Sequence, residues 1–303
     1  MMRMSRDETG GNTVSDFAKF QALGNDYLVI DPNYVDFSPT PESVRLLCDR
    51  HFGVGGDGVL FGPIGPVDSD RPVELRIFNP DGGECEKSGN GIRIFALYLA
   101  QHYLKDEEFV VHTMAGESPV RVRDLAQGVI CVDMGRPLFD AAEIPMLGIR
   151  GPAIAQPLTV DGQELTVTCV NIGNPHTVLR LDEISQDLAH ELGPRIARHP
   201  RFPNGTNVQL LRVVDRGVIE IEIWERGASY TLASGTSSCA AASAAHALGL
   251  VDEVIKVMMP GGVIEIGIAA DGAVAMTGAA EQVTTGWFAP AFRTRLGLPR
   301  LQT

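Results

Sequence analysis

The chain contains an internal duplication, and this feature constrains its fold more than any single motif does. Residues 73–116 align without a gap with residues 219–262, at a constant shift of 146 residues, the distance from Ser88 to Ser234. In both copies an apolar run ends in a polar residue, and a Ser-Gly pair follows nine residues later. Two copies of one folding unit usually pack about an approximate twofold axis, so that equivalent loops can face each other.

Each copy predicts the same elements in the same order. The runs 73–78 and 219–224 alternate polar and apolar residues, which is the period of a half-buried strand. Residues 92–104 and 239–250 are predicted helices, the second rich in small residues that allow close packing. Other runs of strand type lie at 108–114, 119–125, 129–134, 164–170, 253–259, 263–269 and 273–278. The sequence therefore predicts an α+β fold of two pseudo-symmetric half-domains, each a mixed β-sheet wrapped around a central helix, with a cleft between them.

The repeat also suggests where the half-domains end. We expect the first to cover residues 16–137 and to take back a C-terminal strand near 279–290, and the second to cover 138–278. Residues 1–15 are polar and Gly-rich without an apolar segment, so we expect a disordered leader there and no secretory signal. Residues 291–303 are expected to form a loose tail.

The charge balance and the cysteine count exclude several classes of protein. The formal net charge is −13, and a negative surface repels phosphate backbones, so a nucleic-acid partner is disfavoured. No apolar run approaches the length of a membrane span. The odd number of cysteines and the absence of C-x-x-C argue against a disulfide framework or a zinc site and for a reducing cytoplasm; they are Cys48, Cys85, Cys131, Cys169 and Cys239. The seven histidines lack metal-ligand spacing, and we predict no metal.

A Gly-rich stretch, HFGVGGDGVLF (51–61), invites comparison with nucleotide-binding loops. It does not follow a clear strand and open a helix, as a dinucleotide-binding signature would. The sequence also lacks G-x-x-x-x-G-K-[ST]. We therefore predict a glycine loop without a nucleotide.

Ser88 and Ser234 both stand where a predicted helix begins. Serine is a favoured N-cap residue, because its hydroxyl accepts a backbone N–H of the first turn, and capping alone explains the Ser-Gly pairs. The duplication allows a second interpretation. A helix start presents free N–H groups and the positive end of the helix dipole, which suits a carboxylate. Two facing starts could bind one carboxylate between Gly89-Asn90 and Gly235-Thr236.

In that arrangement the side chains at positions 88 and 234 would approach the adjacent carbon from opposite faces. One group would remove a proton and the other would deliver one to the far side, which inverts a stereocentre. The N–H groups would stabilise the enolate-like charge that develops on the carboxylate. The scheme requires no cofactor, and only four lysines are present that could hold pyridoxal phosphate: Lys19, Lys87, Lys105 and Lys256.

Five segments in order and spacing resemble the diaminopimelate epimerase family, over roughly residues 17–288. They are GNDY (24–27), NPDGGECEKSGNGIRIFA (79–96), GNPH (173–176), FPNGTNVQ (202–209) and ERGASYTLASGTSSCAAA (225–242). The resemblance implies a cofactor-independent, two-base epimerase that interconverts LL- and meso-diaminopimelate in lysine and cell-wall biosynthesis. It also implies two similar half-domains that close over the substrate, often within a homodimer, in the cytoplasm.

The resemblance assigns roles to particular residues. Ser88 and Ser234 fall on the family's two catalytic cysteines, and His176 and Glu225 match residues that support the catalytic pair. The implied substrate-binding set is Asn25, Asn79, Gly89, Asn90, Asn174, Asn207, Glu225, Arg226, Gly235 and Thr236. A guanidinium with several amides suits a carboxylate beside an ammonium group. Outside the resemblance, Asn25 and Asn174 follow glycines and could only shape turns.

The sequence departs from the family pattern at the two positions that carry out proton transfer. Both catalytic cysteines are serines, and an alcohol is far less acidic than a thiol of pKa about 8.5, so it is badly matched to proton transfer near neutral pH. Ser229 and Tyr230 stand where the family usually has Gly and Glu. Gly58 replaces a polar residue found in some members.

Several explanations are compatible with these departures. One explanation is an epimerase whose cysteines were exchanged deliberately. The second is a natural paralogue with other chemistry, such as an isomerase of another small carboxylate, and the third is an amino-acid-binding protein without turnover. Cys85, three residues before Ser88, is an alternative base, although the neighbouring Glu84 and Glu86 would raise its pKa. Cys239 is expected to be an inert, packed thiol inside its helix.

Overall fold

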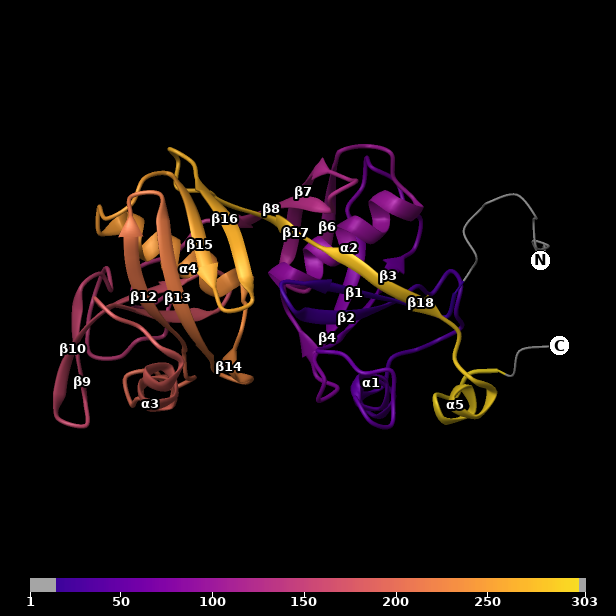
Figure 1. Ribbon diagram of the computed structural model, residues 1–303, viewed down its shortest axis with the longest axis horizontal. Helices are drawn as coiled ribbons and strands as arrows, with labels where there is room; N and C mark the ends of the chain where they lie inside the picture. Colours follow the sequence, from indigo (N-terminus) through magenta and orange to yellow (C-terminus); the bar gives the residue numbers. More distant parts are fainter. Residues whose placement is uncertain (1–14, 300–303) are drawn as a thin grey trace.

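The computed structural model describes residues 15–299 of the chain. Figure 1 shows two lobes side by side, the first coloured indigo to magenta and the second magenta to yellow. The leader expected over residues 1–15 lies, except for Ser15, outside the described residues. Within residues 15–299, no helix is long and apolar enough to cross a bilayer.

The first lobe consists of a sheet and two helices. Its elements are β1 (Phe17–Ala22), β2 (Asn25–Ile30), α1 (Pro41–Cys48), β3 (Val59–Ile64), β4 (Val73–Phe78), β5 (Glu84–Cys85), α2 (Gly89–His102), β6 (Glu108–Thr113), β7 (Gly116–Asp124) and β8 (Val129–Gly135). Strand β2 runs parallel to β3, and β4 runs parallel to β6. The remaining neighbouring pairs in this lobe are antiparallel, so the sheet is mixed.

The second lobe repeats this order. Its elements are β9 (Gln156–Val160), β10 (Gln163–Asn171), β11 (Pro175–Arg180), α3 (Gln186–Ala197), β12 (Asn207–Asp215), β13 (Val218–Glu225), β14 (Ser229–Thr231), α4 (Gly235–Ala247), β15 (Val254–Met259), β16 (Gly262–Ile268) and β17 (Val274–Ala279). Strand β11 is parallel to β12 and β13 is parallel to β15, as β2 is to β3 and β4 to β6. The pseudo-symmetric α+β fold predicted from the duplication is thereby confirmed.

The lobes share one continuous sheet. Strand β8 of the first lobe pairs with β17 of the second in antiparallel orientation. The chain then crosses back, and β18 (Glu281–Gly286) pairs with β1, as the long yellow segment in Figure 1 shows. Strand β9 has the corresponding place in the second lobe, where it pairs with β10. The division into half-domains at residues 137 and 278 stays a prediction.

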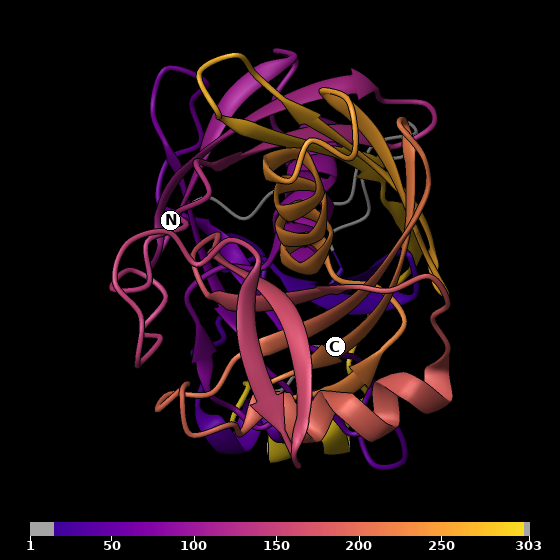
Figure 2. The same cartoon turned by 90° about the vertical axis from the view of Figure 1, so that its left-hand side faces the viewer.

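The central helices are buried inside the two lobes. Figure 2 looks along the long axis and shows α4 surrounded by strands, with α2 behind it. Residues 235–245 of α4 are all buried, because alanine, serine and cysteine let the strands pack closely around the helix. In α2 the equivalent residues 89–99 are also buried, including large apolar side chains such as Phe95. Both helices start earlier than the apolar pattern indicated, directly after the serines.

The expectation of a loose tail after residue 290 is wrong as far as residue 299. Helix α5 (Pro290–Arg295) packs on the first lobe, and the side chains of Leu296 and Leu298 are buried there. Arg293 forms a buried ion pair with Asp16, next to β1. The predicted glycine loop is confirmed, since residues 51–58 form turns and bends before β3.

Candidate active site

Ser88 and Ser234 are the N-caps of the two central helices. Ser88 has an extended backbone, and its Oγ accepts the N–H of Gly91 at 3.1 Å. Ser234 caps α4 in the same way, accepting the N–H of Ser237 over a longer distance of 3.4 Å. The capping expected from the sequence is therefore confirmed, and it fixes the side-chain direction of both serines.

The starts of the two helices meet at their glycines. A Cβ atom added to Gly235 would lie 3.4 Å from the Cα of Gly89, so the residues directly after the two serines are in contact. The thioether of Met276, from β17, packs against both: added Cβ atoms would approach it to 2.8 Å at Gly89 and 2.7 Å at Gly235. A larger residue at either position would have to displace the Met276 side chain, and the two hydroxyl-bearing turns border one place between the lobes.

Each serine has a different polar partner. The hydroxyl of Tyr27, from β2, lies 3.1 Å from the Ser88 Oγ. Ser234 instead lies near the carboxyl group of Glu225, at the end of β13, close enough to affect its pKa, and the Ser234 Oγ lies 3.4 Å from the Thr236 hydroxyl. Burial raises the pKa of Glu225 above its ordinary value, against an opposing effect of the Ser234 hydrogen bond. A carboxyl group of raised pKa is better suited to exchange protons near neutral pH.

The site is shared by both lobes. Glu225, in the second lobe, is among the charges that raise the pKa of Tyr27 and of Cys85 in the first, after the larger effect of burial on each. Lys87, directly before Ser88, has its pKa lowered by burial and lies beside Gly173 of the second lobe. Groups from both copies of the repeat therefore act on one another.

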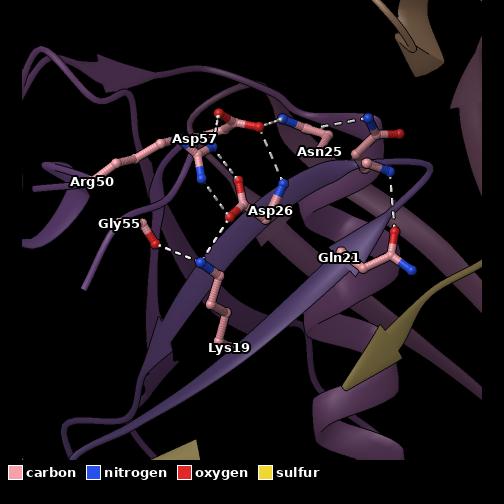
Figure 3. A network of polar contacts seen from close by, with 9 residues as sticks. Lys19, Gln21, Asn25, Asp26, Arg50, Gly55 and Asp57 are labelled. Carbon is pink, nitrogen blue, oxygen red and sulfur yellow. Dashed lines mark hydrogen bonds and ion pairs between the residues drawn. The ribbon is translucent and has the colours of Figure 1, made fainter. Parts of the chain in front are cut away.

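Asn25 belongs to a polar network of the first lobe, shown in Figure 3, and it is also hydrogen-bonded to Asn90. Asn90 Nδ2 donates to Asn25 Oδ1 at 3.1 Å, and Asn25 Nδ2 donates to Asp57 Oδ2 at 3.1 Å. Arg50 in turn binds Asp57 and Asp26. Asn25 is thus held by both of its polar atoms, and its orientation depends partly on Asp57, which no sequence motif identifies as a site residue.

Oppositely charged side chains lie close together behind this network. Lys19 contacts Asp26 at 2.9 Å and donates to the carbonyl of Gly55. Burial acts to raise the pKa of Asp26, but hydrogen bonds from Arg50 and Lys19 outweigh it and lower the pKa to about 2. The carboxylate stays ionised at neutral pH, which keeps the loop around Gly55 and Asp57 against β2.

A buried arginine lies behind the start of α2. Arg93 is fully buried, donates to Asn90 Oδ1 at 2.9 Å and contacts the Met276 sulfur at 3.2 Å. Its Nε has no hydrogen-bond partner among the described residues. Burial lowers the pKa of Arg93 to about 10, so the group remains a cation at neutral pH and adds positive potential at the place where the helix starts meet.

In the second lobe, His176 and Asn174 form a pair. His176 is fully buried in β11, and its Nε2 lies 2.7 Å from Asn174 Oδ1. Its Nδ1 and the Oε1 of Gln209 both lack a hydrogen bond of normal geometry. Burial lowers the pKa of His176 to about 3, against a smaller opposing effect of Gln209, so the imidazole is neutral at physiological pH.

Asn207 and Arg226 form a second pair, at the end of β13. The Asn207 side chain accepts the N–H of Arg226 at 2.9 Å and donates to the carbonyl of Pro175 at 3.1 Å. The Arg226 guanidinium is exposed and donates to the carbonyl of Asn204 at 2.9 Å.

Asn79, after β4, is exposed, and its side chain has no hydrogen bond to another described residue. Its predicted role has the least support from the contacts.

The departures from the family pattern have structural consequences. No side chain fits at Gly58, where a Cβ would lie 2.5 Å from both the Tyr27 ring and the Phe78 carbonyl oxygen. Ser229 adopts a left-handed backbone with φ of 63°, a conformation that favours glycine. The Tyr230 hydroxyl donates to Glu222 at 2.7 Å, and its ring stacks on His190. Tyr230 thus packs on the outer side of β13, beside α3.

All five cysteines are free, and the two that lie near the serines in the sequence, Cys85 and Cys239, have raised pKa values. Cys85 donates to the carbonyl of Lys87, and its pKa is raised, as expected from the sequence. The largest cause is burial, however, and the neighbouring Glu86 contributes less. Cys239 is fully buried in α4 with its pKa raised to about 12, which agrees with an inert, packed thiol.

Comparison with known proteins covers most of the chain. The family model described as diaminopimelate epimerase matches residues 17–139 and 168–283. Diaminopimelate epimerase 2 of Nostoc sp. strain PCC 7120 is 46% identical over 89% of this chain and 94% of its own length. Diaminopimelate epimerase of Cyanothece sp. strain PCC 7425 is 43% identical over 89% of this chain and 98% of its own. Among solved structures, a hydroxyproline epimerase from Agrobacterium vitis is similar in fold, with a TM-score of 0.60 at 15% identity over 88% of this chain and 90% of that one.

Proposed function

The chain belongs to the diaminopimelate epimerase family, and we propose that it is a cofactor-independent, two-base epimerase that interconverts LL- and meso-diaminopimelate. The observation that carries this proposal is the contact between the starts of α2 and α4, each capped by a serine hydroxyl.

The geometry gives each group a step in the reaction. The free N–H groups at the starts of α2 and α4 bind the carboxylate of the reacting carbon and stabilise the negative charge that develops on it. The serine that acts as the base first loses its own proton, which for Ser234 passes to the Glu225 carboxylate, and its oxygen then takes the α-proton. The other serine gives its proton to the opposite face of the carbon, so that one C–H bond is broken on one side and one is formed on the other. Arg93 adds a positive charge beneath the same carboxylate.

We assign the remaining predicted residues to support and recognition. Glu225 exchanges protons with Ser234, and His176 holds Asn174 in place as a neutral imidazole. Asn25, Asn79, Asn174, Asn207 and Arg226 bind the distal amino-acid end of the substrate. The amide groups suit an ammonium or a carboxylate partner, and the exposed guanidinium of Arg226 suits the distal carboxylate.

Serine in both positions predicts slow turnover. An alcohol holds its proton much more tightly than a thiol does, so the proton-transfer steps are costly near neutral pH. The test is exchange of the α-hydrogen of LL-diaminopimelate in heavy water, followed by NMR. We expect slow exchange with inversion for the chain as it is, and a rate about 100-fold or more higher after Ser88→Cys with Ser234→Cys.

The same assay separates two other functions that the serines leave open. Tight binding of diaminopimelate without exchange, before and after the cysteine substitutions, would identify an amino-acid-binding protein. Neither binding nor exchange would indicate another small carboxylate as the substrate. In that case the altered loop at Ser229 and Tyr230, next to Arg226, is the first place to look for changed specificity.

We also propose a homodimer located in the cytoplasm. Both follow from the family resemblance, and a reducing compartment agrees with five free cysteines. Light scattering after size-exclusion chromatography tests the assembly. A mass near twice the 32.6 kDa of one chain is expected, and a single-chain mass at micromolar concentration would contradict the proposal.

A further inference from the structure

Tyr27 contacts one of the two proposed proton-transfer groups. Its ring is 5% exposed, and its hydroxyl lies 3.1 Å from the Ser88 Oγ. Within residues 15–299 this is the only hydrogen bond of the Tyr27 hydroxyl. A buried phenol usually finds a polar partner, and here that partner is the oxygen that the reaction uses.

The Ser88 oxygen has room for two donors. It already accepts the N–H of Gly91 as an N-cap. A hydroxyl oxygen has two lone pairs, so it can also accept the O–H of Tyr27 while its own proton points to the substrate. When Ser88 gives up that proton, its oxygen carries negative charge, and both donors then face an anion.

We propose that Tyr27 is a positioning residue that donates its O–H to the Ser88 oxygen and so makes Ser88 a stronger acid than a serine in water. This inference rests on the proposed function. In the step concerned, the Ser88 O–H bond breaks, a C–H bond forms at the substrate carbon, and the serine oxygen keeps the electron pair. The Tyr27 proton stays on the phenol and strengthens its hydrogen bond to that oxygen.

The surroundings of Tyr27 hold the ring in this position. Gly58 lies against the ring, where any side chain would come within 2.5 Å of it. Strand β2, which carries Tyr27, pairs with β1 on one side and β3 on the other. The backbone of β1, of β3 and of Gly58 therefore holds the Tyr27 ring in place beside Ser88. Glycine at position 58 leaves the space that the ring occupies.

The charge around Tyr27 keeps it protonated. Burial raises its pKa, the hydrogen bond to Ser88 opposes this, and the nearby Cys85, Glu225 and Asp57 raise it further. These groups come from β5, β13 and the loop before β3, the elements whose charges reach the phenol. Tyr27 is thus a donor across the physiological pH range and not a base.

The two serines consequently differ in chemistry. Ser234 has a carboxyl group beside it and a cap hydrogen bond of 3.4 Å, whereas Ser88 has a phenol beside it and a cap hydrogen bond of 3.1 Å. A neighbouring acceptor disfavours an anion, and a neighbouring donor favours it. We therefore expect position 88 to be the more acidic of the two.

The first experiment measures acidity at position 88 without any substrate. In a chain with Ser88→Cys, the rate of alkylation by iodoacetamide is followed against pH, because only the thiolate reacts. Trypsin cuts after Lys87 and Arg93, so the peptide 88–93 reports this thiol separately from Cys85. Adding Tyr27→Phe is expected to raise the pKa of the thiol by about one unit, which is a tenfold loss of thiolate at neutral pH. An unchanged or lower pKa would overturn the proposal.

Two controls make the result specific. Tyr98→Phe removes another buried hydroxyl, one bound to Asp31, and should leave the thiol at position 88 unchanged. A chain with Ser234→Cys should titrate at least one unit higher than the chain with Ser88→Cys, a comparison that requires no change at Tyr27. The reverse order of the two thiols would also overturn the proposal.

A second experiment connects the hydrogen bond to turnover. Tyr27→Phe is expected to lower kcat for α-hydrogen exchange about tenfold and to leave KM nearly unchanged, because the acid at position 88 is weakened while the substrate-binding groups stay in place. A higher KM with kcat unchanged would show that Tyr27 has only a structural role. If neither chain exchanges hydrogen, the proposed function fails, while the thiol titration still decides the role of Tyr27.

Discussion

At the scale of single residues, the site combines groups that the sequence indicates with groups that only the fold brings near. The two serines, Glu225 and the Gly-Asn pairs stand at repeated positions, so the duplication alone selects them. Tyr27 and Asp57 lie far along the chain from the residues they contact, and no local pattern relates them. Arg93 is detectable from the sequence, because it is a cation within an apolar helix. A buried cation is costly, so such a residue indicates a functional or structural role.

The buried His176 predicts a loss of stability in mild acid. A histidine titrates near pH 6.5 when unfolded and near pH 3 in this fold, so the unfolded state binds more protons between these values. The stability that depends on the neutral imidazole is complete above pH 6.5 and is lost as the pH falls, by about 2 kcal/mol at pH 5. Urea unfolding at pH 7 and pH 5 measures this difference.

The variant His176→Gln is the comparison for that measurement. It should unfold with a smaller decrease between pH 7 and pH 5 than the parent chain, while both chains behave alike between pH 7 and pH 8, where the histidine is neutral in either state. Glu225 acts in the opposite direction, since a raised pKa in the folded state favours stability at low pH, but it contributes equally to both chains. Identical acid profiles would contradict a buried, neutral His176.

Asp57 is expected to affect substrate binding although it need not touch the substrate. Its carboxylate accepts from Asn25 Nδ2 and from the Asp26 N–H, so Asp57→Ala frees the side chain of Asn25. We expect the affinity for diaminopimelate, measured by calorimetry, to fall about tenfold, equivalent to about 1.4 kcal/mol. The control is Asp271→Ala, which removes an exposed carboxylate paired with Arg136. Equal affinity for diaminopimelate in both variants would show that Asp57 does not contribute to the binding site.

At the scale of elements, the sequence predicts what has a clear period and misses what does not. Strands β4, β13, β6 and β15 alternate in the expected way, and both central helices were identified. Helix α3 contains Gly193 and Pro194, which disfavour a helix, yet its apolar face packs on β12 and β13. Strand β18 lies where a C-terminal strand was expected, near residues 279–290, although it is largely exposed and has no apolar face. Its position depends on pairing with β1, which is more than 250 residues away in the chain, so it is set by the tertiary structure and not by the local sequence.

Helix α5 shows how a short element can be fixed by one buried pair. Arg293 is 5% exposed and reaches Asp16, which also accepts the N–H of Phe288 at 2.8 Å. Arg293→Ala leaves a buried carboxylate without its cation and is expected to lower the free energy of unfolding by about 3 kcal/mol. Chemical denaturation measures the change.

The neighbouring Arg295 is a matched control, since it belongs to the same helix and has the same charge. It contacts the Phe292 ring and the carbonyl of Phe52 from the surface. Arg295→Ala should change the free energy of unfolding by less than about 0.5 kcal/mol. Similar losses for both arginines would mean that the helix depends on overall charge and not on the buried pair.

At the scale of the whole molecule, the duplication accounts for the site. The same order of strands and helices in each lobe gives two central helices, and the β8–β17 pairing joins the lobes into one sheet. This arrangement places the start of each helix against the other, with Met276 of the shared sheet packed on both. The repeat was visible in the sequence, whereas the junction between the lobes was not, because strand pairing over such distances has no local signature.

The central claim is that two groups act on opposite faces of one carbon. The most direct test starts the reaction with LL-diaminopimelate in heavy water, in the parent chain and after Ser88→Cys with Ser234→Cys, and analyses both isomers at low conversion. Two groups on opposite faces predict deuterium at the inverted carbon of the meso product and almost none in the recovered LL isomer. Deuterium appearing equally in the recovered substrate, or a product that keeps its original hydrogen, would show that a single group carries the proton and would contradict the account.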